Sequence, residues 1–207
     1  MAGVRQFNED QVFDSALALF WDKGYTDTTM QDLAAATGVQ RGSLYHAYQD
    51  KETLFLRVFE RYRSRFLEQV ETALASPDLY TALRGFIDLL ITSMLTGQPT
   101  RGCLSTKTAL SNDVFHEPIR HALQGILDGY SRLLRQRLAR PDAAQGLALP
   151  AEQAIELILT FTRGLVVIER VYQDPERLRA SSETLLSVLL KKPGQGPTNR
   201  KRPANPS

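Results

Sequence analysis

What this chain lacks argues against several classes of protein. Its 207 residues include a single cysteine, Cys103, so an intramolecular disulfide is impossible and a reducing, cytoplasmic setting is expected. It has no run of about 18 uncharged apolar residues, so no membrane-spanning helix is expected. The N-terminal residues lack the apolar core of a secretory signal, and we therefore expect no exported protein.

The chain also lacks the residue groups on which most enzymes depend. Only three histidines occur, and no Ser-His-Asp group, metal-ligand cluster or phosphate-binding glycine loop is recognisable. His116 and His121 resemble part of a zinc-protease motif, but a spacing of five places them about 140° apart around a helix. We therefore expect no catalytic site, no metal site and no cofactor.

Net charge gives no indication of a nucleic-acid partner. The formal net charge is +2, and residues 1–66 contain eight Lys and Arg against nine Asp and Glu. If this segment binds DNA, the placement of individual charges must achieve it, because no overall basic field does.

The hydrophobic periodicity is helical throughout, and the N-terminal part carries helix start and stop signals. Polar caps precede three expected helices, at Asn8, at Thr29 with Asp32 in a capping box, and at Asp50. A short helix is expected between the last two, over about residues 40–48. Gly24 and Gly38 are suited to the ends of the first and second helices.

The rest of the chain predicts further amphipathic helices, and the fold is expected to be all-α. The expected ranges are about 78–95, a short segment after Gly102, about 114–139, 150–172 and 175–191. Pro77 marks a junction between an N-terminal three-helix domain, residues 7–66 with a linking helix over about 51–75, and a larger helical domain over 78–191. Residues 193–207, rich in Pro, Gly and polar residues, are expected to form a disordered tail.

The short third helix has the features of an element that enters the major groove of DNA. Residues 33–49 contain no Asp or Glu, although the whole chain contains 23. Leu44 and Tyr48, four residues apart, are expected to face the core with Val39. The expected DNA contacts are Gln40, Arg41, Gly42, Ser43, Tyr45 and His46, with Thr28, Thr29 and Lys51 as flanking phosphate contacts. The alternative is a helix-turn-helix that serves packing alone.

The stretch from Thr28 to Phe59 resembles the DNA-binding domain of the TetR family of bacterial regulators. The matching residues are Thr28-Thr29-Met30-x-Asp32-Leu33-Ala34, Gly38-Val39, Gly42-Ser43-Leu44-Tyr45 and Asp50-Lys51-Glu52-x-Leu54-Phe55. The resemblance covers about residues 7–66 and implies a transcriptional regulator that binds double-stranded operator DNA. Ala47 stands where the family often has His or Tyr, so Tyr45 and His46 are expected to make more of the phosphate contacts.

The resemblance further implies a homodimer that is formed through the last two long helices and responds to a small inducer. The candidate interface residues are Leu157, Gly164, Leu165, Ile168, Leu178, Leu185 and Leu189. The alternative is that these stripes belong to the core of one chain. A dimer would hold its two reading helices about 34–36 Å apart and bind a near-palindromic operator. We expect a repressor, with an activator as the alternative within the family.

The expected inducer is a small apolar molecule, with an aromatic or amphiphilic one as the alternative, and its pocket is expected among Phe86, Leu90, Met94, Cys103, His116 and Phe161. Cys103 offers an alternative switch, because a thiol at a helix N-terminus near Arg101 and Lys107 has a lowered pKa and reacts with oxidants or electrophiles.

Two other classes of protein remain open at this stage, namely an all-α small-molecule carrier or enzyme, and a helical interaction protein. Sequence-specific DNA binding would separate a regulator from both.

Overall fold

The computed structural model describes residues 7–97 and 100–191, and this part of the chain is helical, without a strand. Its elements are α1 (Glu9–Lys23), α2 (Met30–Thr37), α3 (Arg41–Tyr48), α4 (Lys51–Ala73), α5 (Leu79–Met94), α6 (Leu104–Ala109), the 3-10 helix η1 (Asn112–Phe115), α7 (Glu117–Leu138), α8 (Pro141–Gly146), α9 (Ala151–Tyr172) and α10 (Pro175–Leu189). The all-α prediction is confirmed. The expected tail at 193–207 lies outside the described residues.

The helix starts of the N-terminal part are built as the sequence predicts. The Asn8 side chain accepts hydrogen bonds from the backbone N–H groups of Asp10 and Gln11, at 2.9 and 3.2 Å. Thr29 and Asp32 form both halves of a capping box, at 3.1 and 2.9 Å. These caps satisfy amide groups that have no partner inside a helix, and they fix where α1 and α2 begin.

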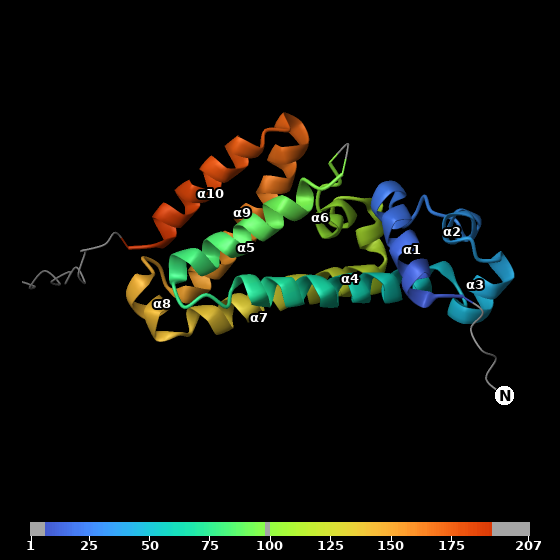
Figure 1. The fold of residues 1–207 in the computed structure, drawn as a ribbon, viewed down its shortest axis with the longest axis horizontal. Coiled ribbons are helices and arrows are strands. Elements are labelled where there is room, and N and C mark those ends of the chain that lie inside the picture. Colours follow the sequence, from blue (N-terminus) through green and yellow to red (C-terminus); the bar gives the residue numbers. More distant parts are fainter. Residues whose placement is uncertain (1–6, 98–99, 192–207) are drawn as a thin grey trace, which may run out of the picture.

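Helices α1, α2 and α3 gather at one end of the molecule, and α4 runs from this end toward the opposite one (Figure 1). Phe55 of α4 holds the group together, because its ring meets Phe20 edge-on at 5.0 Å and Tyr25 at 5.2 Å. We call α1–α3 with the start of α4 the head, and α5–α10 the regulatory helices. The helix α4 belongs to both, since it also packs on α5 and α7.

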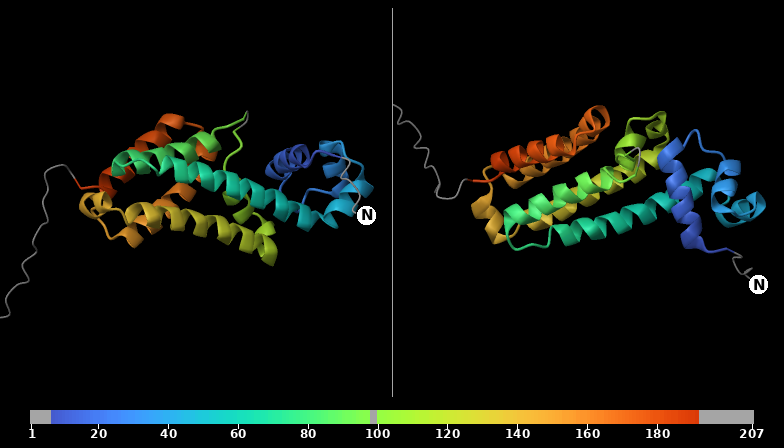
Figure 2. Two further views of the ribbon diagram at one scale, coloured as in Figure 1. Left: turned by 60° about the horizontal axis from the view of Figure 1, so that its bottom comes forward. Right: turned by 45° about the horizontal axis from the view of Figure 1, so that its top comes forward.

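The regulatory helices form a second packed body around the far part of α4 (Figure 2). Tyr130 of α7 lies at its centre, with its ring 6.2 Å from both Phe66 and Phe86. Helix α10 packs on α5 and α9, while α9 also packs on α7. None of the helices in the described ranges is long and apolar enough to cross a membrane.

Two short elements depart from the expected helix ranges. The helix expected over 114–139 begins only at Glu117, because Ser111 caps η1 and Pro118 occupies the first turn of α7. Pro141 follows the end of α7 and begins the short helix α8, which the expected ranges did not include.

Candidate DNA-binding surface and its connection to the regulatory helices

Helix α3 presents one polar face and buries the other. Leu44 and Tyr48 are fully buried, as their spacing predicts, and the Tyr48 ring packs against Phe7 and Phe13 at 6.2 and 5.9 Å. On the opposite side the side chains of Gln40, Arg41, Tyr45 and His46 are exposed, together with Gly42, while Ser43 is half-buried. No carboxylate lies on α3, so this face carries donors and one fixed positive charge.

Two side chains of the exposed face, Arg41 and Tyr45, hold each other in position. The Arg41 guanidinium lies 5.4 Å from the centre of the Tyr45 ring, one helical turn away, and its Nη2 donates to the Tyr45 hydroxyl at 3.5 Å. A Cβ on Gly42 would meet no described atom within 4 Å. The space beside Gly42 is therefore open to a molecule other than this chain.

The two threonines before α2 have different environments. Thr29 is exposed, with its hydroxyl engaged in the capping box. Thr28 is fully buried, and its hydroxyl donates to the carbonyl of Gly24 at 2.6 Å. The prediction that the Thr28 hydroxyl faces a phosphate is therefore corrected, because this hydroxyl holds the turn between α1 and α2.

Lys51 is half-buried and already bound within the head. Its Nζ donates to the carbonyls of Tyr25 and Thr26 at 2.8 and 3.2 Å and lies 4.3 Å from the centre of the Tyr25 ring. Burial lowers the pKa of this amine. An ammonium has three donors, so a phosphate contact by Lys51 would use the donor that remains.

The regulatory helices form hydrogen bonds with the head at the end of α1, a contact that the sequence did not predict. The buried Asp113 of η1 accepts hydrogen bonds from the Tyr25 and Thr26 amides at 3.0 and 2.9 Å, and from the Thr26 hydroxyl at 2.6 Å. Lys107 of α6 donates to the carbonyls of Trp21 and Asp22, both at 2.6 Å. We call this pair of contacts the latch.

Charge complementarity explains the latch. Lys107 places a cation at the C-terminal end of α1, where the helix dipole favours it. Burial would raise the pKa of Asp113, but the hydrogen bonds from Thr26 and Tyr25 outweigh it and lower this pKa. Nothing in the spacing of these residues signals the contact, since Asp113 and Tyr25 are 88 residues apart.

Cys103 caps the start of α6, and its neighbours differ from those expected. Its Sγ lies 3.1 Å from the Ser105 Oγ and 3.7 Å from Nη1 of Arg163 on α9. Burial would raise the pKa of this thiol, but Arg163 and the hydrogen bonds of Ser105 and Thr106 lower it. The expected neighbours Arg101 and Lys107 instead contact Trp21, so Arg163 supplies the positive charge.

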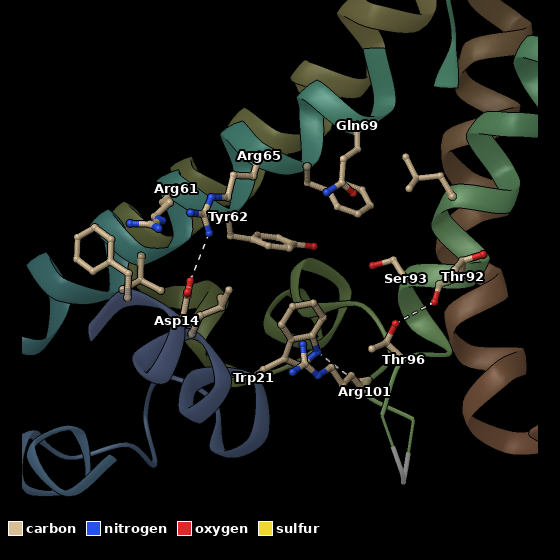
Figure 3. A pocket seen from close by; sticks show the side chains of 15 residues that line it. Asp14, Trp21, Arg61, Tyr62, Arg65, Gln69, Thr92, Ser93, Thr96 and Arg101 are labelled. Atoms are coloured by element: carbon tan, nitrogen blue, oxygen red, sulfur yellow. Dashed lines mark hydrogen bonds and ion pairs between the residues drawn. The ribbon is translucent and has the colours of Figure 1, made fainter. Parts of the chain in front are cut away.

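Besides a cavity of about 250 Å³ that Lys107 and Asp113 line themselves, two cavities open beside the latch. One, of about 380 Å³, lies between α1, α4, α5 and the segment that leads to α6, and it is shown in Figure 3. The other, of about 310 Å³, lies between α6 and α9 and is lined in part by Cys103. Neither of these two cavities is lined by the other five residues of the predicted pocket.

The five residues lie elsewhere for physical reasons. Phe86, Leu90 and Met94 are buried in the core between the regulatory helices, and Phe161 packs against that core. His116 is exposed at the start of α7, with its ring edge-on to Tyr25 at 5.5 Å. Of the six predicted pocket residues, Cys103 alone lines one of the two cavities described above, and a pocket formed by the other five stays a prediction.

The predicted dimer residues divide into two groups. Four of them are buried within the single chain and belong to its core, namely Leu165, Leu178, Leu185 and Leu189. Leu157 and Gly164 are exposed on α9, and Ile168 is half-buried. Apolar periodicity alone does not distinguish a core stripe from an interface stripe, which explains the mixture.

No group of three or more metal-binding side chains occurs among the described residues.

Both the N-terminal and the C-terminal part of the chain match known protein families. Residues 12–58 match the family described as bacterial regulatory proteins, tetR family, and residues 80–185 match the tetracyclin repressor-like, C-terminal domain. The HTH-type transcriptional repressor ComR of Escherichia coli K12 is 30% identical over 145 residues, which are 66% of each chain. The negative regulator IcaR of the biofilm operon icaADBC of Staphylococcus epidermidis is 25% identical over 194 residues, 89% of this chain and 100% of IcaR.

Solved structures agree with this assignment. A cysteine mutant of the TetR family regulator CifR, complexed with a 26-base-pair operator, superposes with a TM-score of 0.79 at 26% identity, over 91% of this chain and 100% of CifR. The reduced form of NemR from Escherichia coli superposes with a TM-score of 0.80 at 17% identity, over 90% and 98% of the two chains, and shows the shared fold.

Proposed function

The chain belongs to the tetR family of bacterial regulatory proteins and is a DNA-binding transcriptional regulator, and we propose that it acts as a homodimeric repressor in the cytoplasm. The observation that carries the proposal is the exposed, carboxylate-free face of α3 at the free end of the head. A small molecule that binds between the head and the regulatory helices releases the repressor from its operator.

The chemistry of the α3 face supports a division of contacts. Arg41 is suited to the O6 and N7 atoms of a guanine, and Gln40 to the N6 and N7 atoms of an adenine. Tyr45, His46 and Thr29 carry donors that bind backbone phosphates. Ser43 and Gly42 allow close approach without a bulky side chain.

The proposed dimer forms through the outward faces of α9 and α10. Exposed apolar residues of these helices include Leu157, Tyr172 and Val188, and Val188 is 55% exposed. Val167 and Val171 are also exposed, but they line the cavity between α6 and α9 as well. A Cβ on Gly164 would meet no described atom within 4 Å, which leaves room for a partner helix. Association would remove this apolar patch from water. A dominant monomer in light scattering at working concentration contradicts the dimer.

The latch gives the proposed release a physical route. Lys107 and Asp113 fasten α6 and η1 to the end of α1, so a shift of these regulatory elements changes the orientation of the head. A ligand acts only through its different affinity for the two orientations. In the dimer, the orientation of the heads that the ligand favours places both α3 helices out of register with the two half-sites of the operator.

The first test is capture of fragmented genomic DNA by the purified protein at about 150 mM salt, where non-specific phosphate binding is weakened. Sequencing of the retained fragments is expected to give a short near-palindrome. Recovery of no sequence above background by folded protein contradicts operator binding and favours the helical interaction protein.

Cys103 supports a second candidate for the signal within the same function. Arg163 lowers the pKa of its thiol, and the thiol lines the cavity between α6 and α9. A thiolate there would attack a peroxide, forming a sulfenic acid while the peroxide is reduced to water. Peroxide is expected to release the wild-type protein from its operator and to leave Cys103→Ser bound. Equal release of both proteins contradicts this candidate.

A further inference from the structure

The cavity between the head and the regulatory helices has an aromatic and aliphatic interior. Trp21 of α1 and Tyr62 of α4 meet edge-on with ring centres 5.4 Å apart, and the Tyr62 ring stacks on Phe66 at 5.8 Å. Leu89 lines the cavity from α5. The volume of about 380 Å³ lies within the range of small-molecule sites. The interior is therefore suited to a hydrocarbon chain or a flat ring.

The charged residues that line this cavity are mostly cations. Arg61, Arg65 and Arg101 line it, against the single carboxylate of Asp14. Arg65 pairs with Asp14 at 3.3 Å, but both side chains are largely exposed, so the pair is weak. Arg61 pairs with Asp10, which lies outside the lining. The cavity wall thus has an excess of positive charge beside an apolar interior.

Arg101 is held in place but not neutralised. Its guanidinium lies 5.2 Å from the centre of the Trp21 ring, and its carbonyl accepts a hydrogen bond from the Trp21 indole N–H at 3.1 Å. Its amide donates to the Thr96 carbonyl at 2.9 Å. Within the described ranges no carboxylate lies within ion-pairing distance of its guanidinium. The donors of this side chain are therefore available to a bound anion.

Hydroxyl groups complete the polar part of the site. Tyr62 and Ser93 point into the space between α1, α4 and α5 (Figure 3). Thr96 lies beside Arg101, but its hydroxyl donates to the Thr92 carbonyl at 3.1 Å. Burial raises the pKa of the Tyr62 hydroxyl well above its ordinary value, so this group stays a neutral donor at physiological pH. Donors thus approach the cavity from α4 and from the end of α5.

We propose that this cavity binds an amphipathic organic carboxylate. Its carboxylate would be held by Arg101 and Arg65, and its apolar body would lie between Trp21, Tyr62 and Leu89. The inference rests on the proposed function and specifies the expected inducer as an amphipathic anion. Because the site includes α1 as well as α4 and α5, its occupant bears on the orientation of the head directly.

Trp21 allows a direct test, since it is the only tryptophan of the chain. Decanoate and hydrocinnamate are titrated against the full-length protein without DNA, each beside its neutral amide, and the Trp21 emission is recorded. Isothermal titration calorimetry repeats each titration independently of fluorescence. We expect each carboxylate to bind about tenfold more tightly than its amide, the value of one charge-assisted hydrogen bond.

Variants assign the effect to the cavity. Arg101→Gln and Arg65→Gln are each expected to weaken decanoate binding about tenfold and to leave decanamide binding unchanged. Arg132→Gln, an exposed arginine of α7 outside the cavity lining, is the matched control and is expected to behave as wild type. Equal affinities for carboxylate and amide, or decanoate binding that is insensitive to both cavity variants, overturn the proposal.

The same samples separate this inference from the function on which it rests. Retention of operator DNA by the ligand-free protein tests the regulator, whereas the titrations above need no DNA. Arginine-dependent binding of decanoate without release of the operator supports the site and contradicts its inducing role. Release of the operator by decanoate from both cavity variants as readily as from wild type overturns the site.

Discussion

Helix α3 and the segment formed by α6 and η1 are both short, but they use polar side chains in opposite ways. On α3 the polar residues Gln40, Arg41 and His46 are exposed to solvent. On α6 and η1 the polar groups of Lys107 and Asp113 are bound to the backbone of the head. The donors of α3 are therefore available to another molecule, while the polar groups of α6 and η1 are already used to join two parts of the same chain.

The largest effect is expected on the buried side of α3. Leu44→Ala removes a fully buried side chain from the head core, and we expect it to lower the free energy of unfolding by about 2–5 kcal/mol. Urea denaturation followed by circular dichroism measures this change. A loss below about 1 kcal/mol would mean that α3 is not anchored by its apolar face.

The latch is expected to contribute the next largest amount. Asp113→Ala leaves the amides of Tyr25 and Thr26 without their acceptor, and we expect a loss of about 2–3 kcal/mol in the free energy of unfolding. Operator affinity is expected to fall as well, because the head loses its fixed orientation. Asp128→Ala, on an exposed position of α7, is the control and is expected to change neither quantity.

The exposed side of α3 is expected to affect binding rather than stability. Arg41→Ala removes the side chain that we propose to contact a guanine. We expect operator affinity to fall by about 1–3 kcal/mol, while the free energy of unfolding stays within about 0.5 kcal/mol of wild type. Fluorescence anisotropy with a labelled operator measures the affinity. If stability falls instead of affinity, Arg41 belongs to the packing of the head and the contrast with Leu44 fails.

The smallest effect is expected on the pH dependence of stability, through the charge of Asp32. Hydrogen bonds from Thr29, with the Lys23 ammonium beside it, lower the pKa of Asp32 from 3.8 to about 2. Because the pKa is lower in the folded state, this stabilisation is present above the unfolded value and is lost as the pH falls from 3.8 to about 2. Asp32→Asn is expected to reduce the slope of stability against pH in that window, as urea denaturation at each pH would show. An unchanged slope means that the cap does not act through the charge of Asp32.

The sequence predicted the features of this fold that depend on neighbouring residues. The caps at Asn8 and Thr29 lie within three residues of the amides they bind, so a local pattern identifies them. The burial of Leu44 and Tyr48 follows from their spacing on one helix face. The exposed polar face of α3 follows from the same spacing.

Features that join distant parts of the chain were not predictable from the sequence. The cation beside the Cys103 thiol is Arg163, 60 residues away, while the cations near Cys103 in sequence contact Trp21 of α1. The cavity depends on Trp21 and Arg101 meeting across 80 residues. Helical periodicity predicts which side chains of a helix are buried, but it does not predict which other element packs against them.

The composition of α4 has a mechanical consequence. Its 23 residues contain neither glycine nor proline, so no built-in hinge interrupts its hydrogen-bond ladder. At 1.5 Å per residue it is a rod about 35 Å long. A tilt of about 5° at its regulatory end would move its tip beside α3 by about 3 Å, a quarter of the width of a major groove. In the proposed release, such a rod would act as a lever, converting a small movement beneath the regulatory helices into a displacement of α3 relative to the groove.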